Sequence, residues 1–410
     1  MNCRHCSKKL EHSFIDLGSS PPSNSFLSKN AMKSSEKWYP LNILVCNNCW
    51  LVQTEDFVSA KEMFSPEYAY FSSYSTSFLE HCELFVNQMI ERFDLSNQSM
   101  FVEVASNDGY LLQYVLKSGV PCYGIEPTHN TAKAARDKGI EVFENFFGEE
   151  FALKIVSKKD KADFMCANNV LAHVPDINDF VKGFKNLLKP HGVVTFENPH
   201  LLNLINGNQF DTIYHEHYSY LSLTSVNKIL STNGLTLFDV EEIPTHGGSL
   251  RYYAQISKTG IHAINENVKK IQDKEDFHGL NNLKFYKNFQ IKTEKIKTDF
   301  LHFLISQKNN NKKVIAYGAA AKGNTMLNFC GIRKDLLSYV VDKNPSKQNM
   351  FTPGSRIPIY NESLIKIDKP DFIVILPWNL QSEIMQQLSY IKQWNGKFVV
   401  VIPNLEIIFK

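Results

Sequence analysis

The most unusual stretch of the chain concentrates side chains that can move protons. Tyr214, His215, Glu216 and His217 are consecutive, so a phenol, two imidazoles and a carboxylate occupy four positions in a row. Removing a proton from a carbon atom beside a ketone requires a base and a group that stabilises the enolate. A histidine with a pKa near neutrality suits the first task. We therefore predict a proton-transfer site here, in which His215 either takes part or satisfies a buried hydrogen bond.

A second histidine is a candidate for the same chemistry. His173 lies in the segment Leu-Ala-His-Val-Pro, and its alternative role is a polar contact at a helix cap. The His-Glu-His spacing at 215–217 is not H-E-x-x-H and is too short for a pair of ligands one helical turn apart, which argues against a catalytic metal.

Two pairs of cysteines have the spacing of metal ligands. Cys3 and Cys6 are separated by two residues, and so are Cys46 and Cys49. Such pairs let both thiolates bind one ion in tetrahedral geometry, and four thiolates leave no open position for catalysis. We predict a structural zinc site, with a redox pair as the alternative. The remaining cysteines lie in apolar patterns and are expected to be buried thiols: Cys82, Cys122, Cys166 and Cys330.

A tight turn after an apolar strand predicts a cofactor site. The stretch EVASNDG runs from Glu103 to Gly109, and its glycine permits a close approach of the backbone to a ligand. It lacks G-x-G-x-x-G, which argues against NAD. Glu126 ends the next strand, where a carboxylate can accept hydrogen bonds from both ribose hydroxyls. This combination resembles the S-adenosylmethionine (SAM) site of class I methyltransferases, with another nucleotide-binding fold as the alternative. The candidate cofactor residues are Glu103, Ala105, Ser106, Asn107, Gly109, Glu126, Asn168 and Asn169.

Two series of apolar runs must position these groups. Four runs in the middle of the chain, each followed by a helical pattern, predict parallel strands with crossover helices, at 101–105, 122–126, 162–167 and 192–197. Four near-continuous apolar runs nearer the C-terminus are typical of strands buried on both faces, at 314–319, 338–342, 372–377 and 398–403. A Lys-rich helical segment at about 263–308 separates the two series, which favours two separate sheets over one large sheet.

The expected architecture is therefore an α/β protein in three parts. A small zinc-binding module covers residues 1–65, a Rossmann-like domain covers 66–240 and opens with a helix at 78–93, and a second Rossmann-like domain covers 241–410.

Bulk composition excludes several classes of function. The 410 residues carry 44 basic and 42 acidic side chains, a net charge of +2, which provides no basic stripe for nucleic acid and no polybasic membrane patch. The N-terminal residues have no apolar core and cannot form a signal peptide. We therefore expect a cytoplasmic protein that needs neither nucleic acid nor membrane and whose cysteines stay reduced.

The motifs taken together resemble a known family. The cysteine pairs, SNDGYLL, GIEP, ANNVLAHVPD, DTIYHEHYSYLS, HGGSLR, YGAAAKGNT and LPWN occur in the order found in the sugar C-methyltransferases of deoxysugar biosynthesis. That family includes the TDP-sugar C-3 methyltransferases. The resemblance implies a zinc-binding N-terminal domain, a central SAM domain and a C-terminal Rossmann-like domain, with the sugar nucleotide between the last two. A monomer is expected.

The same resemblance implies roles for the catalytic candidates. His217 would be the base that removes the proton beside the 4-keto group, with Tyr214 and Glu216 in the same pocket and His173 in the same active site. The enolate carbon would then take the methyl group of SAM.

The remaining motifs suggest where the substrate and cofactor are held. Lys322, with Asn324, follows a strand in the segment GAAAKGNT and suits a diphosphate, although tight packing of a helix on a strand also needs small residues. His246 and Arg251 in HGGSLR supply further contacts to phosphate or sugar, or mark a structural turn. Tyr70 and Tyr74 either close over the cofactor or belong to the core.

Two other functions remain open at this point. The same scaffold could methylate oxygen or nitrogen of a related nucleotide sugar, or the chain could be a non-catalytic sensor of SAM or a nucleotide sugar.

Overall fold

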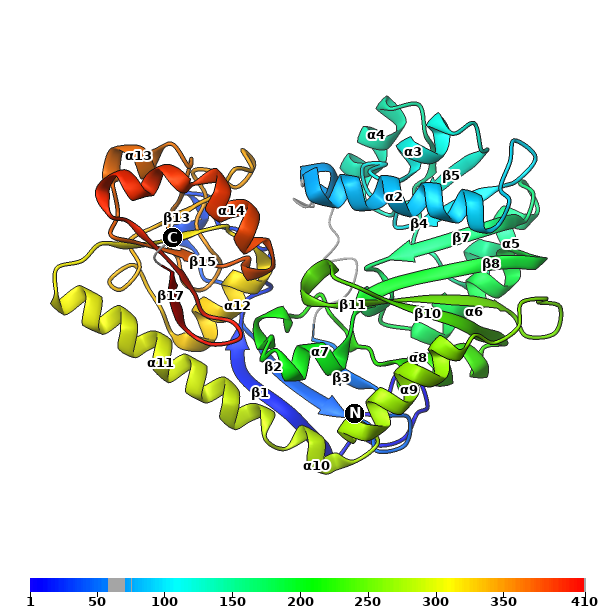
Figure 1. Cartoon of the computed structure of the whole chain (residues 1–410), viewed down its shortest axis with the longest axis horizontal. Coiled ribbons are helices and arrows are strands. Elements are labelled where there is room, and N and C mark those ends of the chain that lie inside the picture. Colours follow the sequence, from blue (N-terminus) through cyan, green and yellow to red (C-terminus); the bar gives the residue numbers. More distant parts are fainter. Residues whose placement is uncertain (58–70, 75, 409–410) are drawn as a thin grey trace.

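Three sheets carry the described part of the chain, which is residues 1–57, 71–74 and 76–408 of the computed structural model. Figure 1 shows the two larger sheets on opposite sides of the molecule, with the N-terminal strands β1, β2 and β3 below and between them. The expectation of two separate open α/β sheets behind a small N-terminal module is confirmed.

The N-terminal sheet is antiparallel and has the order β1-β2-β3-β9. Its strands are β1 (His12–Ser20), β2 (Tyr39–Val45), β3 (Val52–Thr54) and β9 (Ser219–Tyr220). In β2, buried Leu41, Ile43 and Val45 alternate with more exposed residues, the pattern of a strand with one face on a core. Since β9 comes from the middle of the chain, it attaches the N-terminal sheet to the segment that contains His217.

The middle sheet has the strand order β10-β11-β8-β7-β4-β5-β6. All neighbouring pairs from β8 to β6 are parallel, and β11 is antiparallel to both of its neighbours. The strands are β4 (Phe101–Val104), β5 (Cys122–Ile125), β6 (Glu141–Phe143), β7 (Ala162–Asn168), β8 (Leu188–Pro199), β10 (Leu235–Ile243) and β11 (Ser249–Ile256). The sheet is open and mostly parallel, as the apolar runs predicted.

Helices cover both faces of the middle sheet. They are α2 (Thr76–Arg92), α3 (Leu112–Lys117), α4 (His129–Asp137), α5 (Glu149–Val156), α6 (Ile177–Leu187) and α8 (Leu223–Thr232). The helix α7 (Leu201–Asn206) packs instead in the core of the N-terminal and C-terminal sheets. In β4, Phe101 packs with α2 and α3 on one face, whereas Val102 and Val104 belong to the core that contains α6 and α8. Alternate side chains of a buried strand point to opposite faces, so both cores share one set of strands.

The C-terminal sheet has the order β14-β13-β12-β15-β16-β17 and is parallel except for β17. Its strands are β12 (Val314–Tyr317), β13 (Val340–Val341), β14 (Ile359–Tyr360), β15 (Phe372–Ile375), β16 (Lys397–Val400) and β17 (Glu406–Ile408). Its helices are α11 (Phe289–Asn309), α12 (Ala321–Cys330), α13 (Leu364–Asp368) and α14 (Gln381–Gln387). Core residues of β12 pack together with β1 and β2, so the N-terminal and C-terminal sheets share a hydrophobic core.

The Lys-rich segment between the sheets forms three helices, not one. They are α9 (Glu266–His278), α10 (Leu283–Tyr286) and α11. Gly279 ends α9 in the left-handed conformation, with φ of 84°, which glycine adopts at little cost. The carboxylate of Glu275 on α9 accepts hydrogen bonds from the backbone N–H groups of Leu223 and Thr224, at 2.6 and 2.9 Å. These contacts fasten α9 to the first turn of α8.

The expected domain limit at residue 240 falls inside β10, and β11 beyond it completes the middle sheet. The segment HGG, at 246–248, forms the connection of this antiparallel hairpin, which the period of the apolar runs did not indicate.

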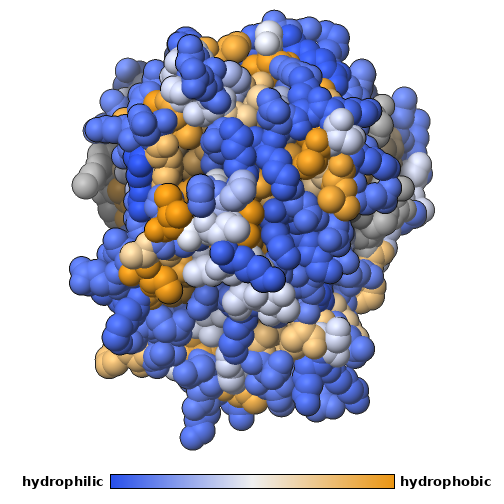
Figure 2. Space-filling model, turned by 90° about the vertical axis from the view of Figure 1, so that its right-hand side faces the viewer, coloured by the Kyte–Doolittle hydropathy of each residue, from blue (hydrophilic) through white to orange (hydrophobic). Residues whose placement is uncertain are grey.

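The surface agrees with an ordinary buried core. The face drawn in Figure 2 is mainly hydrophilic, with apolar side chains in separate small groups. Among the described residues, no helix is both long and apolar enough to cross a bilayer.

Candidate active site

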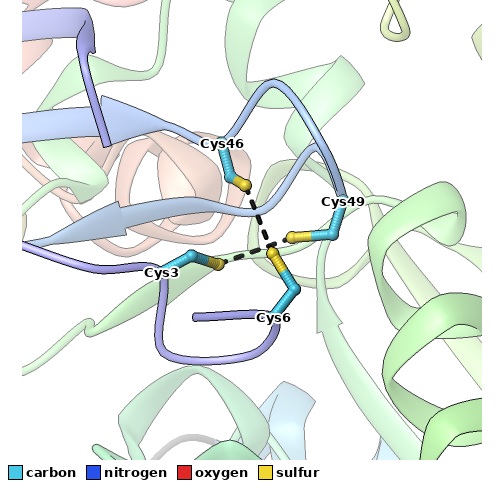
Figure 3. A group of neighbouring side chains, drawn as sticks. All are labelled: Cys3, Cys6, Cys46 and Cys49. Carbon is cyan, nitrogen blue, oxygen red and sulfur yellow. Dashed lines mark hydrogen bonds between the residues drawn. The ribbon is translucent and has the colours of Figure 1, made fainter. Parts of the chain in front are cut away.

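The four predicted zinc ligands meet at one point. Their sulfur atoms all lie within 4.8 Å of one another, and Figure 3 shows the two pairs facing each other across the cluster. Cys3 and Cys6 come from the N-terminal turn, and Cys46 and Cys49 come from the turn between β2 and β3. The Nε2 amide of Gln53 donates to the sulfur of Cys3 at 3.2 Å, a contact that favours the thiolate form. The set of four thiolates fits a closed tetrahedral zinc site.

A pocket opens at the carboxyl edge of the middle sheet. It encloses about 970 Å³ of empty space, part of it open to solvent, and is bordered by the segments that follow β4, β5, β6 and β7. Five predicted cofactor residues line it: Ala105, Asn107, Glu126, Asn168 and Asn169. Ligands of open α/β sheets bind at this edge.

Glu126 ties together two of the loops that border the pocket. One carboxylate oxygen accepts the backbone N–H of Asn107 at 2.9 Å, and the other accepts the N–H of Thr128 at 2.9 Å as well as its hydroxyl. Burial raises the pKa of Glu126, and these donors oppose the rise. The carboxylate therefore lies in the pocket in a fixed orientation.

The pocket residues fit SAM. Ala105, Asn107 and Asn169 have positive φ angles of 57°, 47° and 58°, so the backbone at this edge bends sharply around the space. Within the described residues, the buried Oδ1 atom of Asn168 has no hydrogen-bond partner, which leaves an acceptor for a ligand group. An acidic residue, backbone turns and amide groups around one cavity suit the ribose and the amino-acid part of SAM.

Three predicted cofactor residues do not line the pocket. Glu103 and Ser106 are fully buried. Ser106 packs where a side chain on Gly124 would have to lie. Gly109 has φ of 74°, and a Cβ added there would lie 2.5 Å from Cδ1 of Ile140. The positive φ and the packing against the protein itself both favour glycine here, and the close approach to a ligand stays a prediction.

The structure describes one of the two tyrosines that were predicted to close over the cofactor or to belong to the core. Tyr70 lies outside the described residues, and Tyr74 is the last residue of a short 3₁₀ helix, Ser72–Tyr74.

Several aromatic residues line the pocket without having been predicted. Phe146 and Phe147 follow β6, and Phe78 lies on α2. Phe146 is 40% exposed although it is a large apolar residue. An aromatic pair three and four residues after the end of β6 was the available signal, since the loop that follows this parallel strand also lies at the carboxyl edge.

The histidine cluster adjoins this pocket. His173, which lines the pocket, and His217 have ring centroids 4.6 Å apart, and the ring of Tyr214 lies 4.0 Å from that of His217. Nδ1 of His217 lies 2.8 Å from the carbonyl oxygen of Thr212. A carbonyl only accepts, so Nδ1 carries the proton and Nε2 has a free lone pair. This is the tautomer that a base requires.

Burial keeps both histidines neutral. It lowers the pKa of His173 to about 4. It also lowers the pKa of His217 well below 6.5, and the neighbouring His173, His246 and Lys322 lower it further. A neutral imidazole can accept a proton at physiological pH.

The other two members of the YHEH segment contact neighbouring parts of the chain. Nε2 of His215 donates to the carbonyl of Pro40 at 3.1 Å, which is the buried hydrogen bond considered for it. Both carboxylate oxygens of Glu216 lie 2.8 Å from Nδ2 of Asn24, and the negative charge of Glu216 attracts Lys347. Glu216 thus faces the N-terminal and C-terminal parts of the chain.

Lys322 and His246 lie near enough to His217 that both lower its pKa. Nζ of Lys322 donates to Oδ1 of Asn379 at 2.7 Å and lies 4.5 Å from the ring centroid of Trp378. His246 lines the SAM pocket, and its expected contact with phosphate or sugar stays a prediction.

The other two predicted substrate residues are engaged elsewhere. Nε of Arg251 donates to Glu197 at 2.6 Å and Nη1 to Glu241 at 3.0 Å, inside the middle sheet. Nδ2 of Asn324 donates to the carbonyl of Ser23 at 2.7 Å, and Asn324 is 1% exposed. Both side chains use their hydrogen-bond donors on other parts of the protein, as buried polar groups generally do. A substrate contact is not supported for either.

Three family models match successive parts of the chain. They are described as "Putative zinc binding domain" over residues 3–64, "Methyltransferase domain" over 78–240 and "C-methyltransferase C-terminal domain" over 244–403. The C-methyltransferase NovU of Streptomyces niveus is 30% identical over 406 residues, which is 99% of this chain and 96% of the relative.

Solved methyltransferases are similar at lower levels. Magnesium protoporphyrin IX methyltransferase of Synechocystis PCC 6803, with bound SAM, is 13% identical and has a TM-score of 0.33, over 43% of this chain and 78% of its own. A SAM-dependent methyltransferase of Clostridium acetobutylicum is 13% identical with a TM-score of 0.35, over 43% of this chain and 92% of its own. At these TM-scores the similarity to solved structures does not support a function for this chain.

The chain belongs to the C-methyltransferase family, because it aligns with NovU over almost the full length of both proteins. It is a SAM-dependent methyltransferase with a zinc-binding N-terminal domain, and the predictions of enzyme class and cofactors are confirmed.

Proposed function

We propose that this member of the C-methyltransferase family methylates the carbon next to the keto group of a nucleotide-linked 4-keto-deoxysugar. The carbon would be C-3, the nucleotide TDP and the intermediate an enolate. The observation that carries the proposal is the contact of His217 with His173, which joins a neutral histidine to the SAM pocket. Methylation of carbon needs such a base, whereas methylation of an amine needs none.

The proposed base is His217. Its Nδ1–H is bound by Thr212, so Nε2 is the atom that can take the α-proton of the sugar. Tyr214 packs on the imidazole ring and is proposed to line the sugar site, with Glu216 beside it. His173 would orient the base from the side of the SAM pocket.

When bound, SAM supplies a methyl group on a positively charged sulfur. The chain's own contribution is to hold the two substrates in line, an effect that can supply a large part of the rate enhancement. The segments around Ala105, Glu126 and Asn168 would hold the cofactor, and Lys322 would contact the sugar nucleotide.

The expected division of labour among three parts of the chain stays a prediction. We propose that residues 1–65 hold zinc, that 66–240 together with the adjoining hairpin bind SAM, and that the rest of 241–410 contacts the nucleotide. A monomeric state and a cytoplasmic location also stay predictions, and light scattering of the purified chain tests the first.

The decisive experiment separates carbon from other acceptors. A TDP-4-keto-deoxysugar is incubated with the enzyme in deuterated water, with S-adenosylhomocysteine in place of SAM. The α-carbon should gain deuterium, and with SAM the product should carry its new methyl group on that carbon. A methyl group on oxygen or nitrogen, without exchange, would refute the proposal.

Two variants test the base and its alternatives. His217→Asn should abolish exchange and methylation while the Kd for SAM stays within about twofold. His215→Asn is the matched control, because His215 binds the backbone of Pro40 and not the cofactor pocket. Equal activity of wild type and His217→Asn would remove His217 as base, and the absence of any turnover in wild type with a panel of keto-sugars would favour a binding protein.

A further inference from the structure

The loops after β12 and β15 of the C-terminal sheet hold two motifs, GAAAKGNT and LPWN, whose contact with the substrate the proposed function does not specify. The chain leaves β12 toward β13 on one side and returns to β15 on the other, so the loops after β12 and β15 flank a topological switch point. Open α/β sheets bind ligands at such points. Lys322 follows β12, and Trp378 and Asn379, from the segment LPWN, follow β15.

The lysine is held in a fixed position at this point. Its ammonium donates to Oδ1 of Asn379 at 2.7 Å and lies 4.5 Å from the centre of the Trp378 indole. Lys322 is partly buried and lies in the first turn of α12, and its ammonium contacts the loop that follows β15.

One short segment links the loops after β12 and β15 to the proposed base. Nε1 of Trp378 donates to Oδ2 of Asp211 at 2.8 Å. The carbonyl oxygen of the next residue, Thr212, accepts the hydrogen bond from Nδ1 of His217 at 2.8 Å. Asp211 is 1% exposed and attracts Lys322. The same short 3₁₀ helix, Phe210–Thr212, therefore binds the indole on which the lysine lies through Asp211 and the base through Thr212.

The cofactor side of the site is equally close. A Cβ on Gly247 would lie 2.4 Å from the edge of the Trp378 indole, so the indole packs directly on the backbone there. The preceding residue, His246, lines the SAM pocket. Trp378 thus contacts Lys322 on one side and the backbone beside the cofactor pocket on the other, and the charge of Lys322 acts on the proposed base, His217.

Charge decides which part of a substrate suits this lysine. Lys322 and Asp211 together carry no net charge, and the adjacent histidines are neutral. A diphosphate would bring two or more negative charges next to the Asp211 carboxylate. A ketone is neutral when it binds and gains charge only in the enolate, which a fixed ammonium stabilises at the moment of reaction.

We propose that Lys322 stabilises the enolate oxygen during deprotonation and that Asp211 is the residue that positions Lys322 for this role. The inference rests on the proposed function and assigns the oxyanion group that the function requires. It replaces the diphosphate as the partner of Lys322.

The α-carbon–hydrogen bond breaks, its proton goes to Nε2 of His217, and its electron pair forms the carbon–carbon double bond as the carbonyl pair moves to oxygen beside Lys322. The enolate carbon then forms a bond to the methyl carbon, the sulfur–methyl bond breaks, and its electron pair stays on sulfur. The imidazolium of His217 releases its proton to solvent.

The test separates stabilisation of the enolate from binding of the diphosphate. Lys322→Met should lower both the deuterium exchange rate and kcat by about 100- to 1,000-fold, the usual loss when one oxyanion donor is removed. Its Kd for thymidine diphosphate should stay within about twofold of wild type. A Kd weakened tenfold or more, with kcat at saturating substrate retained, would overturn the inference in favour of the diphosphate.

Matched variants exclude a purely structural effect. Lys312→Met removes a lysine that pairs with Asp371 at 2.9 Å just before β12, and it should leave exchange unchanged. Lys322→Arg keeps the charge and should retain more exchange than Lys322→Met, and equal losses in the two variants would count against a role for the charge.

The role of Asp211 has its own readout. Asp211→Asn keeps an acceptor for the Trp378 indole but removes the charge, and should lower kcat with little change in the Kd for SAM. In the Asp211→Asn background, Lys322→Met should cost less than it does in wild type, because the two residues act as a unit. Full additivity would refute the positioning role. If wild type itself exchanges no α-proton, the proposed function fails, whereas normal exchange in Lys322→Met overturns only this inference.

Discussion

Replacement of Gly109 by alanine tests how the SAM loop is built. Gly109 has φ of 74°, a left-handed conformation, and an added Cβ would lie 2.5 Å from Cδ1 of Ile140 and 3.2 Å from Cβ of Ala135. Gly119 has almost the same φ, 75°, but an added Cβ meets nothing within 4 Å. The two glycines therefore share a backbone cost and differ in packing.

The magnitudes follow from that difference. A left-handed non-glycine residue costs about 1–2 kcal/mol. Forcing an extra carbon into a packed site costs about 1–3 kcal/mol more. Gly119→Ala should thus lose about 1–2 kcal/mol of unfolding free energy, and Gly109→Ala about 2–5 kcal/mol.

Denaturation by urea and calorimetry of SAM binding measure the two consequences. Gly109→Ala should unfold at lower urea than Gly119→Ala, while both bind SAM as wild type does at temperatures where they are folded. Equal stabilities of the two variants would refute the packing argument. Loss of SAM binding in a stable Gly109→Ala protein would instead support a close approach of this glycine to the cofactor.

Further predictions concern the metal, the cofactor and the base. Purified protein should contain about one equivalent of zinc, which Cys46→Ser should lose, as measured by metal analysis. Glu126→Gln should weaken SAM binding by about tenfold in calorimetry, since the amide cannot accept from all the donors that Asn107 and Thr128 now supply. The acid limb of kcat/KM should lie below pH 6.5, because burial lowers the pKa of His217 below that value and the base stays neutral until lower pH. An acid limb above pH 7 would contradict the burial of this histidine.

The elements of the fold were predictable because their signals are local. Apolar runs at 101–105 and 372–377 became β4 and β15 within two residues, since strands buried on both faces need continuous apolar sequence. The antiparallel pair β10 and β11 was not predicted, because the turn at His246 and Gly247 is indistinguishable by residue type from a ligand loop.

The candidate site was predictable in part for the same reason. Residues close together in the sequence, such as Tyr214 and His217, are recognised by their types, and the cysteine pairs are recognised by their spacing. Arg251 and Asn324 have the same residue types as ligand-binding groups, yet their partners Glu197 and Ser23 lie 54 and 301 positions away. Only the tertiary structure reveals that such side chains are already paired.

The zinc site can affect catalysis although it lies outside the pocket. Its cysteines hold the turn that joins β2 to β3, and β3 pairs with β9 directly after the YHEH segment. Thr54 at the end of β3 donates its hydroxyl to the carbonyl of His217 at 3.4 Å, and Pro40 at the start of β2 accepts from His215. Release of zinc would free β3 and with it the backbone of the base, whose useful geometry tolerates little displacement. Loss of metal should therefore lower kcat more than it weakens SAM binding, because the hydrogen bonds that order Glu126 come from Asn107 and Thr128 and not from the cysteine turn.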